Sequence, residues 1–343
     1  MTSHISNNSL QQSWSYFDSK SVLVTGGTGS FGRHFIKTLL REAKPRRVVI
    51  FSRDEMKQFD MQNELVSADQ TGVLRFFIGD VRDQSRLELA LRDIDFVIHA
   101  AALKQVPTAE YNPFECIHTN VLGAEYIVQA ALRCGVQRVV ALSTDKAASP
   151  INLYGASKLA SDKIFIAANN LSGANGTRFS VVRYGNVLAS RGSVIPFFKR
   201  LVAEGADALP ITDPRMTRFW ITLPLAAEFV ASCIEMMHGG EIFVPKIASM
   251  KVTELAEAVA PQLPHKIVGI RPGEKLHEVM ITEDDARNTM ELTDRYIIQP
   301  SFGPFSKSGL IPGAPVAEDF RYASDTNTEW LDVQMLRTLI GQI

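Results

Sequence analysis

Hydrophobic positions along the first half of the chain fall into two alternating patterns. Short runs rich in valine, isoleucine and phenylalanine are followed by longer stretches in which apolar residues recur every three or four positions. The short runs predict six strands, at residues 21–25, 48–51, 74–78, 96–99, 138–142 and 179–183. Because these strands alternate with helical stretches, the sequence predicts an α/β fold of the Rossmann type, a doubly wound parallel sheet.

The helical stretches differ in how clearly their ends are marked. Residues 31–42 are predicted as the helix that follows the first strand. The helix before the fifth strand has apolar residues on one face, Asn120 as its candidate N-cap and Gly135 at its end.

The pattern changes after about residue 186, where proline and glycine divide the chain into pieces with short helices such as residues 253–260. We therefore expect three parts in the chain. They are a flexible N-terminal tail over residues 1–19, a Rossmann domain over residues 20–185, and a smaller C-terminal lobe over residues 186–343, interleaved with the domain.

Composition excludes several classes of protein. The chain has 343 residues, with 36 basic and 37 acidic side chains and a formal charge of −1, so we expect no general attraction to nucleic acid or anionic lipid. The N-terminus lacks the features of a signal peptide and no apolar run reaches the length of a membrane span, which predicts a cytoplasmic protein without membrane contact. The three cysteines lack paired ligand spacing, so neither a metal site nor a disulfide framework is expected.

A glycine-rich loop joins the first strand to the first helix. Glycines three positions apart allow a tight turn and a close approach of the backbone to a pyrophosphate at the helix N-terminus. The sequence therefore predicts a dinucleotide site. Its loop residues are Gly26, Thr28, Gly29, Ser30, Phe31 and Gly32.

The end of the second strand bears on the choice of dinucleotide. Arg53 and Ser52, with Lys57 nearby, suit the 2′-phosphate of NADP, because an arginine fork matches phosphate oxygens. The alternative is that Arg53 is solvated and Asp54 binds the ribose of NAD. The other expected cofactor contacts are Gln58, then Asp80 and Val81 after the third strand, Ala100, Ala101 and Lys104 after the fourth, and Val187. Lys104 is close enough in sequence to reach either the cofactor or the substrate.

The densest chemical signal follows the fifth strand. Tyr154 and Lys158 are four residues apart, hence one turn apart on one helix face. An ammonium beside a phenol favours the phenolate, so Tyr154 is predicted to take a proton from a hydroxyl while hydride leaves the same carbon. Lys158 is also expected to bind the nicotinamide ribose.

The glycine loop with this Tyr154–Lys158 pair resembles the extended short-chain dehydrogenase/reductase family. Within it, the chain is similar over about residues 20–300 to the inverting UDP-N-acetylglucosamine 4,6-dehydratases. The segments that carry the resemblance are Ser143–Ala147, Pro150–Lys158, Gly185–Val187, Ser190–Pro196, Met216–Phe219 and Arg271–Glu278. The resemblance implies NADP as cofactor, UDP-N-acetylglucosamine as substrate, a dimer or hexamer of identical chains, and the first step of pseudaminic acid synthesis for flagellin glycosylation.

An acid and a base beside Thr144 extend the predicted chemistry beyond oxidation. A ketone at C4 of the sugar acidifies the hydrogen at C5, so water can then be eliminated across C5 and C6. We assign Lys146 as the base at C5, Asp145 as the acid for the C6 hydroxyl, and Tyr154 as the base for the C4 hydroxyl. Hydride returns to C6, and reprotonation of C5 on its other face is what the resemblance implies for inversion.

The substrate is expected beyond the carboxyl ends of the strands. Its predicted contacts are Lys104, Lys146, Tyr154, Asn186 and Arg191, with Arg218 and Arg271 on the two phosphates and Glu274 on the ribose, as the resemblance implies. For each arginine alone, a surface ion pair is the alternative.

Two other functions compete with dehydration. A nucleotide-sugar 4-epimerase shares the glycine loop, Tyr154 and Lys158, but needs no acid and base at C5 and C6. A non-catalytic NADP-binding regulator on the same fold is expected to lack Tyr154 or Lys158, and this sequence has both.

Overall fold

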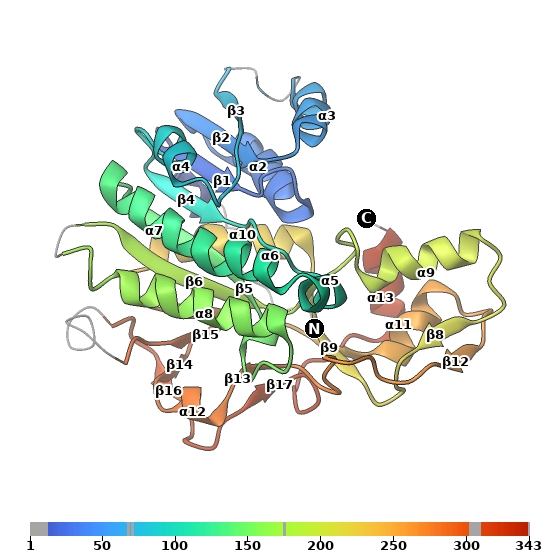
Figure 1. Ribbon diagram of the computed structural model, residues 1–343. Coiled ribbons are helices and arrows are strands. Elements are labelled where there is room, and N and C mark those ends of the chain that lie inside the picture. The colour runs from blue at the N-terminus through green and yellow to red at the C-terminus, as the bar shows by residue number, and fades with distance from the viewer. Residues whose placement is uncertain (1–12, 67–68, 70–71, 174–175, 302–309, 342–343) are drawn as a thin grey trace.

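A large, mostly parallel sheet organises the chain (Figure 1). The computed structural model describes residues 13–66, 69, 72–173, 176–301 and 310–341, and ten strands of this part form one sheet in the order β16-β14-β15-β10-β6-β5-β4-β1-β2-β3. The parallel strands are β1 (Ser21–Thr25), β2 (Arg47–Ser52), β3 (Leu74–Ile78), β4 (Phe96–His99), β5 (Arg138–Thr144), β6 (Arg178–Tyr184) and β10 (Ile242–Pro245). The antiparallel edge consists of β15 (Arg295–Ile298), β14 (Thr289–Glu291) and β16 (Ala314–Pro315).

The predicted α/β class and all six predicted strands are confirmed. Side chains of β1 are buried at every position, as expected for a strand that is covered on both faces. Helix α2 (Ser30–Glu42) packs against α10 (Leu223–Met236) on one side of the sheet. Helix α3 (Glu55–Leu65) connects β2 to β3. On the other side α4 (Gln84–Ala90) packs against α7 (Gly123–Cys134), which packs against α8 (Leu153–Ala168) (Figure 1).

A second, smaller apolar core is built from elements after residue 186. They include α9 (Val194–Ala203), β8 (Leu209–Ile211), β11 (Ser249–Lys251), α11 (Val252–Val259) and α13 (Val333–Gly341). The exposed strand β12 (His265–Ile267) pairs with β8, and these elements lie beside the large sheet in Figure 1. The helix predicted at residues 253–260 is thus confirmed to within one residue. The division of the chain at residue 185 stays a prediction, since β10, β14, β15 and β16 from the C-terminal half extend the same sheet.

Short pieces connect these two cores. Strand β9 (Thr217–Ile221) pairs with β7 (Asn186–Val187) and with β11, and β13 (Val279–Ile281) pairs with β17 (Tyr322–Ala323). The remaining helices are α5 (Val106–Tyr111), α6 (Pro113–Ile117) and α12 (Glu283–Ala286), together with a π-helical turn at His118–Leu122 and the 3₁₀ turn η2 at Asp145–Ala147. Strand β9 and the segment before β13 therefore bring residues from the second half of the chain to the end of β5.

The expectation of a flexible tail over residues 1–19 is wrong for residues 13–19. Trp14 and Phe17 are buried, and their rings contact Phe35 of α2. Phe17 also meets Phe96 of β4 edge-on. Aromatic residues among polar neighbours supply enough apolar surface to fix this segment on the core, whereas residues 1–12 lie outside the described part of the chain.

The interpretation of Asn120 as a helix N-cap is also wrong. Asn120 lies inside a helical stretch, within the π-turn that joins α6 to α7, and it is buried. Its side chain accepts a hydrogen bond from the Leu103 backbone N–H (2.8 Å), and donates to the Leu103 carbonyl (2.8 Å) and the Ser157 hydroxyl (2.9 Å). Asn120 therefore fixes the segment after β4 against α8, while Gly135 ends α7 with a left-handed φ of 68°, as predicted.

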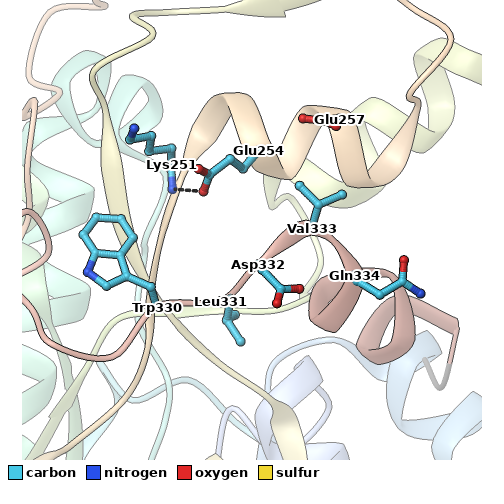
Figure 2. Close-up of a pocket in the computed structure, with 8 residues that line it drawn as sticks. All are labelled: Lys251, Glu254, Glu257, Trp330, Leu331, Asp332, Val333 and Gln334. Carbon is cyan, nitrogen blue, oxygen red and sulfur yellow. Dashed lines mark hydrogen bonds between the residues drawn. The ribbon is translucent and has the colours of Figure 1, made fainter.

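A pocket of about 770 Å³ lies between α11 and the segment that leads into α13 (Figure 2). Three carboxylates, Glu254, Glu257 and Asp332, line it beside Lys251 and Trp330. It shares no lining residue with the predicted catalytic or binding sites, so we place the candidate active site elsewhere, at the carboxyl ends of the parallel strands.

Candidate active site

The glycine loop has the geometry that a pyrophosphate needs. Gly26 has a left-handed φ of 63°, and a Cβ there would lie 2.9 Å from the Ala101 nitrogen. A Cβ on Gly32 would lie 2.6 Å from the Gly27 Cα, so both positions require glycine. No side chain caps the first turn of α2, whose backbone N–H groups remain available for an anion. The residues present therefore fit a dinucleotide.

The side chains at the end of β2 lie either at the edge of the dinucleotide site or at the start of α3. Arg53 is largely exposed, 3.8 Å from Asp80, and the Ser52 hydroxyl accepts a hydrogen bond from Thr28 at 3.2 Å. Asp54 instead caps α3, because its carboxylate accepts from the Lys57 N–H at 3.0 Å and also pairs with the Lys57 ammonium. This arrangement leaves Arg53 at the edge of the dinucleotide site, and engages Asp54 and Lys57 with each other.

The placement of Gln58 corrects its predicted role as a cofactor contact. The side chain is buried, and its amide nitrogen donates to the backbone carbonyls of Ser52 and Phe77, both at 2.9 Å. Gln58 therefore ties the end of β2 to the end of β3. This polar side chain of α3 points inward because it can donate to carbonyls at both strand ends, and the Ser52 carbonyl also accepts from the Gly79 N–H at 3.0 Å.

The ends of β3 and β4 complete the predicted cofactor side. Asp80 forms an ion pair with Arg82 at 2.7 Å, and buried Val81 lies against Gly123. The N–H groups of Ala100 and Ala101 both donate to the Thr25 hydroxyl, at 3.1 and 3.2 Å, which fixes the turn after β4 beside Gly26. Burial lowers the pKa of Lys104, and among the described residues no ion-pair partner is found for it.

The predicted acid and base lie together at the end of β5. Asp145 is completely buried, and its Oδ1 accepts hydrogen bonds from the Thr144 hydroxyl (2.9 Å) and the Lys146 ammonium (3.0 Å). Lys146 is also 3.4 Å from the Asn186 side-chain oxygen. Burial raises the pKa of Asp145. Burial acts to lower the pKa of Lys146, but the carboxylates of Asp145 and Glu278 outweigh it, so this pKa is raised.

Tyr154 and Lys158 both lie on α8 and are buried, as the motif predicted. Burial raises the pKa of Tyr154 to about 12, against the opposing effects of the Lys146 charge and a hydrogen bond with Thr144. The Lys146 charge therefore acts on the phenol in favour of the phenolate, and the predicted role of Lys158 beside Tyr154 stays a prediction. Burial lowers the pKa of Lys158, with Asp162 acting in the opposite direction.

Arg191 lies beside the cofactor loop. Its backbone N–H donates to the Ser30 hydroxyl at 3.1 Å. Its side chain lines a small pocket with Thr28, Ser30 and the cationic residues Arg33 and Lys37. The segment after β7 thus contacts the glycine loop, and the predicted substrate contact of Arg191 stays a prediction.

The guanidinium of Arg218 is occupied by protein groups. It is buried and donates to the backbone carbonyls of Thr217, Lys275 and Leu276 at 2.7 to 3.0 Å. Strand β9 thus places Arg218 against the turn before β13, and its predicted contact with a substrate phosphate stays a prediction. Arg271 is exposed and lies 3.5 Å from Glu274. The turn that contains these two residues contacts the start of α8, because the Asn152 side chain donates to the Gly273 carbonyl at 2.8 Å.

Sequence reasoning missed Glu278 as a functional residue. Glu278 is buried directly before β13, and its carboxylate lies 3.2 Å from the Lys146 ammonium. It was visible only as the last letter of the Arg271–Glu278 motif. The signal that could have found it is a glutamate directly before the apolar run Val279–Ile281, since a carboxylate buried beside such a strand requires a cation.

Neither a metal site nor a membrane span is found in the part of the chain that the structure describes. No group of three or more His, Cys, Asp or Glu side chains is arranged to hold an ion there. None of the helices described combines the length and the apolar character needed to cross a bilayer.

Comparison with known proteins agrees with this geometry. The model of the family described as polysaccharide biosynthesis protein matches residues 22–300. The chain belongs to this family. An inverting UDP-N-acetylglucosamine 4,6-dehydratase of Campylobacter jejuni subsp. jejuni serotype O:23/36 (strain 81-176) is 56% identical over 332 residues, covering 95% of this chain and 98% of that protein. The predicted resemblance to the inverting dehydratases is thus confirmed.

Solved structures show the same architecture for this member of the polysaccharide biosynthesis family. Pen from Bacillus thuringiensis superposes with a TM-score of 0.86 at 36% identity, covering 95% of this chain and 98% of Pen. DesIV, a dTDP-glucose 4,6-dehydratase from Streptomyces venezuelae solved with NAD bound, has a TM-score of 0.66 at 26% identity and covers 75% of this chain and 86% of DesIV. The Rossmann-type fold is confirmed by both.

Proposed function

We propose that this chain is an inverting UDP-N-acetylglucosamine 4,6-dehydratase. One observation carries the proposal: a buried acid, Asp145, contacts a lysine, Lys146, at 3.0 Å beside the phenol of Tyr154. An enzyme that only oxidises and reduces C4 needs Tyr154 and the dinucleotide, but has no use for a second acid and base. The 56% identity with a Campylobacter jejuni enzyme of this activity supports the same conclusion.

Each side chain has one proton to move. Tyr154 takes the proton of the C4 hydroxyl, and the adjacent Lys146 charge stabilises the phenolate that does so. Lys146 takes the proton from C5, and Asp145 gives a proton to the C6 hydroxyl, which leaves as water. When bound, the oxidised nicotinamide dinucleotide accepts the C4 hydride and returns it to C6, so the reaction needs no other oxidant.

The contact between Asp145 and Lys146 explains how both catalytic forms arise together. In the resting site the pair is an ammonium and a carboxylate. A shift of one proton across their hydrogen bond gives a neutral amine and a neutral carboxylic acid, which are the base and the acid that elimination needs. Burial of Asp145 favours this neutral form, because low polarity penalises separated charges. Lys146 then holds the proton that returns to C5 on the other face in an inverting enzyme.

Residues at the ends of β1 and β2 would hold the cofactor. The uncapped N-terminus of α2 suits the pyrophosphate, and Arg53 with Ser52 suits a 2′-phosphate, which favours NADP over NAD. Arg191 and Arg33 add positive charge beside Thr28. The preference for NADP is tested by comparing the affinities of the two dinucleotides for the purified protein.

The decisive experiment is incubation of the protein with UDP-N-acetylglucosamine and NADP in deuterated water, followed by proton NMR. The expected product is a 4-keto-6-deoxy sugar that carries deuterium at C5, with coupling constants of the inverted configuration. An epimer that keeps its C6 hydroxyl identifies a 4-epimerase, and a chemically unchanged nucleotide sugar identifies a binding protein. A Lys146→Ala variant that forms the product as fast as the unchanged protein refutes the role of Lys146.

The wider setting of the reaction stays a prediction. The proposed product suits the first step of pseudaminic acid synthesis for flagellin glycosylation. A cytoplasmic location and assembly into a dimer or hexamer of identical chains are predicted in the same way.

A further inference from the structure

Two buried carboxylates, and not one, lie against the proposed base. Lys146 Nζ is 3.0 Å from Asp145 Oδ1 and 3.2 Å from Glu278 Oε1. Asp145 comes from the turn after β5, whereas Glu278 precedes β13, more than 130 positions later in the chain. The second carboxylate is therefore a product of the tertiary fold, and the reaction proposed above assigns it no proton to move.

The two carboxylates have different surroundings. Besides Lys146, the cations Arg218 and Lys275 act on Glu278, and the Arg218 Nε is 3.7 Å from Glu278 Oε1. Burial acts to raise the pKa of Glu278, but these three cations outweigh it and the pKa is lowered. Asp145 has Lys146 as its one cationic neighbour among the groups that act on it, and burial raises its pKa. Glu278 is thus the carboxylate that stays ionised.

The backbone holds Glu278 in place from both sides. Its N–H donates to the Ser324 hydroxyl at 2.9 Å, and its carbonyl accepts from the Ser324 N–H at 2.8 Å. Arg218 in turn donates to the Lys275 and Leu276 carbonyls in the same turn. In the described part of the chain, one oxygen of each carboxylate, Asp145 Oδ2 and Glu278 Oε2, is buried without a hydrogen-bond partner. Each carboxylate therefore uses its other oxygen on Lys146.

We infer that Glu278 is a positioning residue for the proposed dehydration: its carboxylate holds the Lys146 side chain in place while a proton moves between Lys146 and Asp145, and its negative charge favours the protonated form of Asp145, which acts as the acid. This inference rests on the proposed function. Without a second anion, Asp145 would be the sole neutraliser of Lys146 and would resist protonation. Because their environments differ, Glu278 stays ionised while Asp145 can take up a proton.

Loss of the Glu278 charge is expected to shift the pH dependence of the reaction in one direction, which an experiment can check. The negative charge of Glu278 acts to raise the pKa of both Asp145 and Lys146. The other groups that interact with Lys146 are Asp145, Arg218 and Lys275, with the phenol of Tyr154 beside it, and these side chains are the same when Glu278 becomes glutamine. Removal of one charge at this distance is expected to move both limbs of the kcat–pH profile to lower pH, by about 1–3 pH units.

The test compares Glu278→Gln, which removes the charge and keeps the shape, with Glu278→Asp, which keeps the charge. We expect the glutamine variant to shift the profile and lose kcat with little change in KM, and the aspartate variant to keep the wild-type midpoints. Glu241→Gln is the matched control, because Glu241 is equally buried but hydrogen-bonds Ser180 and Gly239 away from the site. An unshifted profile in folded Glu278→Gln overturns the inference.

A measurement on the unaltered protein covers the case in which Glu278→Gln does not fold. Infrared difference spectra between wild type and Asp145→Asn report the protonated carboxyl of Asp145 as pH is varied. Titration of this band above the pH of an ordinary aspartate supports the inference, and titration below it overturns the inference. If wild type makes no 4-keto-6-deoxy sugar while this titration is as expected, the proposed function fails and the charge arrangement stands.

Discussion

Replacement of Gly155 by alanine is the sharpest test of how the fold positions the catalytic groups. Gly155 follows Tyr154 on α8, and a Cβ at this position would lie 2.2 Å from the Lys146 carbonyl oxygen. It would also lie 3.1 Å from the Lys146 carbonyl carbon, so the conflict is with backbone that has no rotamer to change. The close approach of Gly155 is thus what brings Tyr154 to the turn that contains Asp145 and Lys146.

The size of the effect follows from these distances. An ordinary van der Waals contact begins at 3.4 Å, so the two backbones must separate by about 1.2 Å to admit the methyl group. A misplacement of about 1 Å can cost roughly 100-fold in rate, which corresponds to about 2.7 kcal/mol in the activation free energy. Overpacking costs roughly 1–3 kcal/mol of stability, and the better helix propensity of alanine returns about 1 kcal/mol of it. Activity is therefore expected to fall much more than stability.

The assay is kcat for the 4-keto-6-deoxy product, with the midpoint of thermal unfolding measured on the same samples. Gly341→Ala in α13 is the control, because a Cβ at Gly341 meets no atom within 4 Å. We expect full activity from the control and a folded, nearly inactive Gly155→Ala protein. An unchanged kcat in Gly155→Ala would refute the view that this backbone contact sets the distance between Tyr154 and the acid–base pair.

Three further outcomes are expected. Arg53→Ala should weaken NADP binding by roughly 10- to 100-fold in a fluorescence titration, the worth of a charge-assisted hydrogen bond, and equal losses for NADP and NAD would contradict its role. Asn120→Ala, which loses hydrogen bonds to Leu103 and Ser157, should lower the free energy of unfolding by roughly 2–3 kcal/mol in urea and reduce kcat, whereas an unchanged urea midpoint would speak against it. Burial, with the Lys158 charge, lowers the pKa of His99 to about 3, so between pH 6.5 and 3 only the unfolded chain binds a proton on His99. The free energy of unfolding should therefore fall by about 1.4 kcal/mol per pH unit in this range. His99→Asn should flatten this slope in urea titrations, and a slope equal to that of wild type would argue against the role of His99.

The strands were predictable because the buried parallel sheet leaves a local pattern. Runs of β-branched residues marked β1 to β6, and each run coincides with the strand that the structure shows. Strands β14 and β16 have three and two residues, too few for any periodicity. Asn120 has the composition of an N-cap, but whether a polar residue caps a helix or lies within one depends on its partners, Leu103 and Ser157, which are distant in sequence.

The candidate site was predictable to the extent that it is local in sequence. Thr144, Asp145, Lys146, Tyr154 and Lys158 lie within one segment of the chain, and the structure brings the first four into contact. The protein partners of Arg191 and Arg218 could not be predicted, because a residue type in a motif does not reveal which group its side chain or backbone meets. Glu278 was missed for the same reason: its partner Lys146 belongs to another part of the chain.

The residues that are local in sequence and those that come from the second half of the chain serve different steps of the proposed reaction. In the proposed reaction, oxidation at C4 uses Tyr154 and Lys158, which one helix after β5 supplies together. The proposed elimination uses Asp145 and Lys146, and Glu278, which contacts Lys146 and Arg218, comes from the second half of the chain. Changes in the C-terminal segments can therefore retune the acid–base pair while the oxidising part stays the same. Proteins with this fold can share the first step of their reaction and differ in the later steps, because the groups that decide those steps are carried by different parts of the chain.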